Sequence, residues 1–226
     1  MSTETVPART AADEYRPVDL ARVREIIGFP SPFIAEKKQS FIGEFVARFI
    51  AHSTFFCVAT TDESGRLDNS PKGDPPGSVR ILDPWTLAVP DRPGNKLADT
   101  FENISRNPAV GLVFFVPGVR EAVRVNGDAF LSDDPELLAM LGAEGKPAVL
   151  ATVVRVREVF SQCGKAVVRA KLWEGDRRGL AEAMTLGGET AAMIVAESAG
   201  KMASSFGGMV GELGDRLEHE YRYGLY

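Results

Sequence analysis

The chain has 226 residues, 44% of them hydrophobic and 25% charged, and its formal net charge is −5 at pH 7. This length and balance are those of an ordinary globular protein with one good-sized core. The negative charge argues against nonspecific binding to nucleic acid or to an anionic membrane surface.

Residues 1–34 are expected to form an N-terminal arm with a short helix. The small, polar residues 1–17 favour a flexible arm that docks on a partner. Apolar residues at helical spacing predict a helix over 18–27, which a glycine and two prolines end. A second helix is predicted over about 35–51, with one apolar stripe in the core. The stripe consists of Phe41, Ile42, Phe45, Val46, Phe49 and Ile50.

Short apolar segments separated by turn residues then predict an antiparallel sheet. The segment Phe55–Thr61 is almost wholly apolar and is expected to be buried on both faces, and Asp62–Gly65 follows as a hairpin turn. After this hairpin turn a strand is predicted over 66–72. A strand over 78–82 is predicted to pair again after the turn GDPPG. The further predicted strands are 85–89, 109–116, 121–131 and 149–160. Strands at this spacing favour an α+β fold, an antiparallel split β-barrel with flanking helices.

Helices are predicted between and after the strands. An amphipathic helix over 96–105 follows the segment DRPGNK, and Asp133 or Asp134 caps another helix to about Leu141. The barrel domain is placed at 35–175. Residues 176–226 are interpreted as a helical extension of the same domain, which packs on the barrel or on a second subunit.

Cationic side chains lie at strand ends and at a helix start within residues 69–108. Lys72 ends a strand, Arg80 interrupts an apolar strand, where an unpaired charge is costly, and Lys96 opens a helix, where a cation is unfavourable. Each of these three cations is easier to explain if an anion binds next to it, and the start of a helix suits a phosphate. Alternatives remain open: Lys72 as a solvated charge, Arg80 paired with a carboxylate, and Asn95 as a simple N-cap.

A second cationic pattern lies near the end of the last strand. Lys165 and Arg169 are four residues apart and share a face of a helix, so their mutual repulsion is tolerable beside an anion. Two solvated side chains are a nearly equal alternative. Trp173 suits either stacking on a ligand ring or filling an interface.

The cysteines and histidines form no catalytic pattern. Cys57 and Cys163 are far apart, which gives no disulfide framework and favours a reducing cytosol. The two histidines lack a metal-ligand spacing, which disfavours a histidine-bound metal or haem. Since no signal peptide and no spanning apolar run is visible, we expect a cytoplasmic protein.

Four motifs in order carry a family resemblance. They are SPKGDPPG at Ser70–Gly77, PDRPGN at Pro90–Asn95, RVNG at Arg124–Gly127, and a segment FxxCxKAxxRxxLW that runs from Phe160 to Trp173. With them the chain resembles the pyridoxamine 5'-phosphate oxidase-type flavoproteins, and more narrowly a bacterial branch of these, over about residues 41–173. Each motif alone is weak, whereas the combination is specific.

The resemblance implies an FMN-binding split barrel that forms a homodimer, with FMN in two equivalent clefts between the subunits. It implies an FMN-dependent oxidoreductase in which the flavin ring carries the electrons, with NADH or NADPH as the candidate donor and no essential acid or base among the side chains. The positions it assigns to FMN are Lys72, Val79, Arg80, Arg92, Asn95, Lys96, Arg124, Lys165, Arg169 and Trp173. The last four come from late segments, of the same or the other subunit.

Two departures separate the chain from true pyridoxamine phosphate oxidases. It has Gly94-Asn95-Lys96 at the helix entry in place of Ser-Arg-Lys, and it ends in YRYGLY in place of Arg-Leu-Ala-Pro. These differences leave FMN binding in place and argue against pyridoxamine phosphate as the substrate. Two alternatives remain: an F420-dependent reductase on the same fold, and a non-enzymatic flavin-binding or sensor protein.

Overall fold

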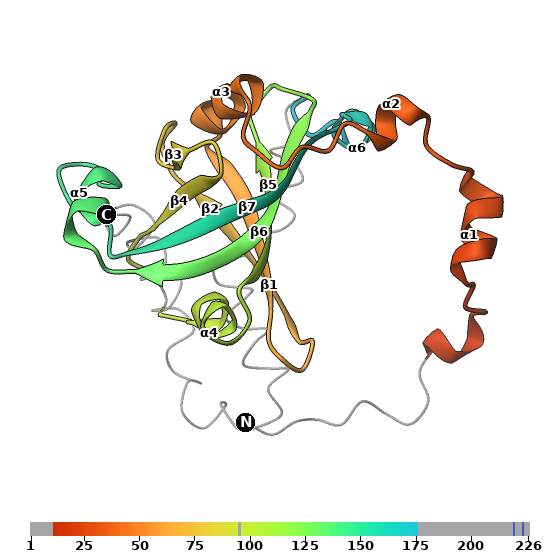
Figure 1. The fold of residues 1–226 in the computed structure, drawn as a ribbon, viewed down its shortest axis with the longest axis horizontal. Helices are drawn as coiled ribbons and strands as arrows, with labels where there is room; N and C mark the ends of the chain where they lie inside the picture. Colours follow the sequence, from red (N-terminus) through yellow and green to blue (C-terminus); the bar gives the residue numbers. More distant parts are fainter. Residues whose placement is uncertain (1–10, 95, 176–218, 220–222, 224–226) are drawn as a thin grey trace. The chain divides into compact units, whose positions relative to one another are not determined.

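A computed structural model of the protein describes residues 11–94, 96–175, 219 and 223 (Figure 1). The predicted tail over 176–226 lies almost wholly outside these residues. The chain divides into two units, Met1–Lys37 and Lys38–Tyr226, while the predicted limits of the barrel domain, 35–175, stay a prediction.

The first unit holds three short helical segments. They are η1 (Ala11–Glu14), α1 (Leu20–Ile27) and α2 (Pro32–Ala35). Asp19 caps α1 by accepting a hydrogen bond of 2.8 Å from the backbone N–H of Arg22, which satisfies one of the unpaired groups at the helix start. The predicted helix over 18–27 is therefore confirmed within two residues.

The second predicted helix is shorter than expected. It begins only with α3 (Glu44–His52), because Gln39 is paired with Val159 through two backbone hydrogen bonds of 2.7 and 2.9 Å. A residue whose backbone N–H and C=O both bond to a strand cannot also continue a helix. The predicted core stripe is only partly inside. Its buried residues are Ile42, Val46, Phe49 and Ile50, and its exposed residues are Phe41 and Phe45.

The second unit is built on one seven-stranded antiparallel sheet in the order β2-β1-β5-β6-β7-β4-β3. The strands are β1 (Phe55–Thr61), β2 (Leu67–Gly73), β3 (Arg80–Asp83), β4 (Thr86–Asp91), β5 (Ala109–Phe115), β6 (Ala122–Ser132) and β7 (Leu150–Gln162). The long strands β6 and β7 form the central pair in Figure 1. This sheet with its flanking helices confirms the predicted α+β split-barrel class.

Backbone hydrogen bonds do not close the barrel, since β2 and β3 are the two edges of the sheet. The strand after GDPPG pairs again, as predicted, and its partner is β4. The turn carries the chain from one edge to the other. Ion pairs Lys72–Asp91 and Asp74–Arg92 join the β2 side to the β4 side, so side chains bridge the split.

The strand β1 alternates instead of being buried on both faces. Phe56 and Val58 are buried, whereas Phe55 is 42% exposed and Cys57 half-buried, because alternate residues of a strand point to opposite faces. The prediction of burial on both faces is wrong for the single chain. The outer face nevertheless remains apolar and continues across β5 through Val113.

Besides α3, three further helices of the described residues lie between or after the strands. α4 spans Asp99–Arg106, α5 spans Pro135–Met140 and α6 spans Lys165–Ala170. Asp134 caps α5 by accepting hydrogen bonds of 3.0 Å from two backbone N–H groups of its first turn, as predicted. α4 begins three residues later than predicted.

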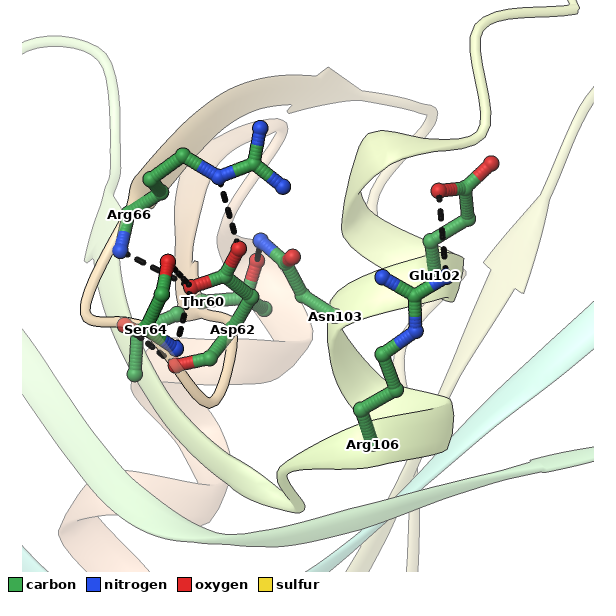
Figure 2. A network of polar contacts seen from close by, with 8 residues as sticks. Thr60, Asp62, Ser64, Arg66, Glu102, Asn103 and Arg106 are labelled. Atoms are coloured by element: carbon green, nitrogen blue, oxygen red, sulfur yellow. Dashed lines mark hydrogen bonds and ion pairs between the residues drawn. The ribbon is translucent and has the colours of Figure 1, made fainter.

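Asp62 holds the β1–β2 hairpin turn together (Figure 2). Its Oδ1 accepts hydrogen bonds of 2.7–2.9 Å from the hydroxyl and backbone N–H of Ser64 and from the backbone N–H of Arg66, whose Nε donates to Oδ2 at 2.7 Å. The Ser64 hydroxyl and the Arg66 guanidinium hold the pKa of Asp62 far below its usual range. Beside this turn, Asn103 of α4 donates to Thr60 Oγ1 at 3.0 Å. The hairpin and α4 are thus fixed to each other.

Replacing Asp62 with asparagine is expected to lower the midpoint of thermal unfolding by several degrees at about pH 7. Since the folded pKa lies below the unfolded one, the ionised carboxylate stabilises the fold above the unfolded pKa of about 3.9. That contribution is lost as the pH falls toward the folded pKa. Differential scanning calorimetry should therefore show the gap between the two proteins shrinking below about pH 4. A constant gap would contradict this explanation, and Glu63→Gln in the same turn is the control.

Candidate functional site

A cleft of about 190 Å³ opens where the end of β2 approaches the end of β4. The curled sheet brings together here the motifs SPKGDPPG and PDRPGN, which are separate in the sequence. Two predicted site residues, Lys72 and Arg92, meet in this cleft. Its lining consists of Phe56, Pro71, Lys72, Gly73, Asp74, Ser78, Pro90, Asp91 and Arg92.

The two cations of the cleft are held differently. Lys72 Nζ lies 3.4 Å from Asp91 Oδ1, longer than the roughly 2.7–2.9 Å of a close charge-assisted hydrogen bond. Arg92 Nε and Nη2 each lie 2.8 Å from Asp74 Oδ2, and both side chains of this pair are largely buried. A guanidinium carries five N–H donors in a planar fork that matches carboxylate and phosphate oxygens. Lys72 and Arg92 are thus groups of the kind that bind a phosphate, and each is paired with a carboxylate of the same lining.

Within one chain, Val79 and Arg80 do not line the cleft that contains Lys72. The side chain of Val79 is buried in the core at 7% exposure. Arg80 begins the edge strand β3, where it is exposed and paired with Ala88. The expectation that Arg80 is a costly charge among buried residues is therefore wrong, because edge strands leave such side chains in water.

The predicted phosphate-binding helix start is also different from expectation. α4 begins at Asp99 with Ala98 as its N-cap, and its first turn carries Asp99 and Glu102. Lys96 lies before the helix with a φ of +63°, and Asn95 lies outside the described residues. The prediction that Lys96 opens the helix is therefore wrong. The positive end of the helix dipole is complemented by the acidic side chains of the first turn.

Arg124 leaves the sheet on the side opposite to Lys72. Arg124 is directly paired with Val113, which is paired with Cys57, whereas Lys72 is paired with Phe56. Directly paired residues share a face, and neighbours along a strand alternate. One chain therefore does not bring Arg124 and Lys72 around one ligand.

A polar network around Arg124 was not anticipated from the sequence. Glu158 accepts hydrogen bonds from Lys38 at 2.8 Å and from Asn126 of the RVNG motif at 2.9 Å. The bond from Lys38 is the main reason that the pKa of Glu158 lies below its usual value. The charges of Lys38 and Arg124 lie 5.1 and 5.0 Å from the ring centre of Phe160. The pairing of β6 with β7 and the bridge between Gln39 and Val159 bring these residues together, and no local pattern in the sequence signals either contact.

Two of the four late site residues, Lys165 and Arg169, line a second hollow of about 400 Å³, whereas Arg124 and Trp173 do not. Lys165 and Arg169 share a face of α6, as predicted, and both line this hollow. Trp173 follows the helix, is 37% exposed, and donates from Nε1 to the carbonyl of Val119 at 2.8 Å. The lining consists of Arg120, Glu121, Gly164, Lys165, Val168 and Arg169.

Two other kinds of site find no support in the described residues. Over residues 11–94 and 96–175, with 219 and 223, the acidic, histidine and cysteine side chains form no cluster of three that could hold a metal. Within the same part of the chain, every helix is too short or too polar to cross a membrane.

Comparison with known proteins assigns a family. The model of the pyridoxamine 5'-phosphate oxidase family matches residues 42–163, more than half of the chain. A search of curated proteins found no match.

Three solved structures illustrate the similarity. HupZ of Group A Streptococcus is 18% identical over 54% of this chain and 94% of its own, with a TM-score of 0.45. A Lactobacillus delbrueckii protein assigned as a pyridoxamine 5'-phosphate oxidase is 28% identical over 55% and 98%, with a TM-score of 0.43. An FMN-binding protein of Syntrophomonas wolfei is 9% identical over 51% and 82%, with a TM-score of 0.40.

Proposed function

Because the chain belongs to the pyridoxamine 5'-phosphate oxidase family, we propose that it is an FMN-dependent oxidoreductase. The flavin ring supplies hydride or electron transfer to a small molecule, with NADH or NADPH as the candidate donor. The side chains of this protein bind and orient the cofactor and its reaction partner. The observation that carries the proposal is the meeting of Lys72 and Arg92 in one cleft formed by two of the family-like motifs.

The cleft suits the phosphate end of FMN for two reasons. Lys72 and Arg92 offer two positive charges from different segments, and the loose contact to Asp91 leaves Lys72 able to turn toward an anion. The exposed Pro71 offers apolar surface beside these charges, and the buried Phe56 and Pro90 form the wall behind it. Concave sites of this kind combine apolar walls with a few placed polar groups.

We further propose that the protein is a homodimer with FMN between the subunits. Lys72 and Arg124 leave opposite faces of the sheet, so a second copy is needed to bring both kinds of side chain to one flavin. The outer face of β1 and β5 is suited to such a contact. It presents the rings of Phe55 and Phe115, 6.3 Å apart, and Cys57 and Val113.

The visible absorption spectrum of the purified protein tests this proposal. We expect a flavin spectrum, either as isolated or after addition of FMN, and release of FMN on heating, identified by chromatography. A protein that is colourless and does not bind added FMN would contradict the proposal. Displacement of FMN by F420 would indicate the deazaflavin instead. Steady-state oxidation of NADH or NADPH by the loaded protein then separates an enzyme from a flavin-binding protein.

A further inference from the structure

The hollow beside α6 carries an excess of positive charge that the proposed FMN site does not use. Arg120, Lys165 and Arg169 line it together with one carboxylate, Glu121, so its lining has two net positive charges. Within the described part of the chain, none of the three cations takes part in an ion pair. Like charges gathered in one concavity are unfavourable unless an anion binds there.

The hollow is fixed in shape because α6 is attached to the β5–β6 turn at both ends. At its start, Gly164 packs so closely on this turn that a Cβ atom would lie 2.7–2.9 Å from atoms of Arg120. After its end, Trp173 donates its hydrogen bond to Val119. The backbone positions that carry Arg120 and the two helix cations are therefore fixed relative to one another, while their exposed side chains extend into the hollow. A fixed backbone frame lowers the entropic cost of gathering these charges around a ligand.

The hollow is distinct from the cleft but lies at the same end of the sheet. The two linings share no residue. Gly73 at the end of β2 is aligned, through Phe55 and Phe115, with Ala122 at the start of β6. Three strand spacings of about 4.8 Å separate these two strands, so a ligand in the hollow and a flavin held from the cleft are within reach of each other.

We propose that this hollow binds the phosphate groups of a nucleotide other than FMN. The role of this nucleotide as the partner of the flavin rests on the proposed function, whereas the binding itself does not. The volume of about 400 Å³ exceeds what one phosphate needs and lies in the range of small-molecule sites. Two arginines match phosphate oxygens with their planar forks. Glu121 would repel a simple polyanion but can accept hydrogen bonds from ribose hydroxyls, and Val168, 46% exposed, offers apolar contact.

Calorimetric titration with NADP⁺ and NAD⁺ tests this site in the full-length protein, with and without FMN. We expect both to bind, NADP⁺ more tightly because of its additional phosphate. The double variant Lys165→Ala/Arg169→Ala should weaken NADP⁺ binding at least about tenfold and leave the thermal midpoint unchanged. Arg48→Ala/Arg106→Ala is the control, since it removes two exposed cations from other helices and should leave binding unchanged.

Each other outcome has a defined meaning. No binding of either dinucleotide to the unmodified protein, or equal affinity of the double variant, would overturn the proposal. A double variant that loses FMN to the same degree as NADP⁺ would also overturn it, by assigning the hollow to the flavin. Binding of NADP⁺ to a protein that does not bind FMN would support the hollow and contradict only the proposed function.

Discussion

Replacing Lys72 with methionine is expected to weaken FMN binding about 10- to 100-fold, the range expected for losing one charge-assisted hydrogen bond to a phosphate. The fold should be little affected. The contact of Lys72 with Asp91 is long and partly exposed, so it contributes little to stability. Methionine keeps an apolar stem near the ring of Phe101, over which the lysine ammonium lies at 5.6 Å. Quenching of FMN fluorescence gives the affinity, and thermal unfolding of the FMN-free protein checks the fold.

Lys72 is a better probe of the cleft than Arg92. The pair Arg92–Asp74 is largely buried, with 14% and 7% of the two side chains exposed. Removing one partner of a buried pair costs about 3–5 kcal/mol, so an Arg92 variant would lose stability as well as affinity. Its reduced FMN binding could not be separated from partial unfolding.

Two arginine variants complete the experiment on Lys72. Arg106→Met removes an exposed cation of α4 and should bind FMN normally. Arg80→Met is the informative comparison, since Arg80 does not line the cleft of its own chain. An affinity loss for Arg80→Met as large as for Lys72→Met would show that Arg80 contacts the flavin outside this cleft, as the proposed dimer would allow. Normal affinity of the Lys72 variant would place the phosphate elsewhere.

The sequence predicts the strands well because their pattern is local. Alternating residues in β6 and turn residues at Asp62–Gly65 already specify which segments extend and where they turn. The errors occur where distant pairing decides. Gln39 bonds to Val159 and so shortens the predicted helix before α3, and no local feature of residues 35–43 indicates this.

The candidate site was predictable only in part for the same reason. Motif composition identified Lys72 and Arg92, and the curl of the sheet brings them together. Whether Arg124 shares their face depends on strand register, where a shift of one residue reverses the side. Register is set by contacts across the whole sheet and cannot be read from one segment. The placement of Lys165 and Arg169 in a separate hollow follows from the packing of α6 on the β5–β6 turn.

Replacing Gly127 with alanine is expected to destabilise the protein by about 3 kcal/mol or to prevent folding, the upper end of the usual cost of overpacking. A Cβ atom at position 127 would lie 2.2 Å from the carbonyl oxygen of Arg155 and 3.1 Å from Cγ1 of Val154. Both residues belong to β7, and the β6–β7 register shifts between Asn126 and Gly127. Such an irregularity brings two backbones close, and only glycine leaves room for it.

The obstacle at Gly127 is backbone of the central strand pair, so relief would require moving β6 away from β7. Gly111→Ala is the matched control, because its Cβ would meet only the side-chain oxygen of Asn126, at 3.3 Å, which can shift. Urea unfolding should show a loss below about 1 kcal/mol for this control. Equal losses in both variants would contradict the argument from close approach. A large loss confined to Gly127→Ala would mean that the glycine of the RVNG motif is required by the fold, and that its place in the motif gives no indication of flavin contact.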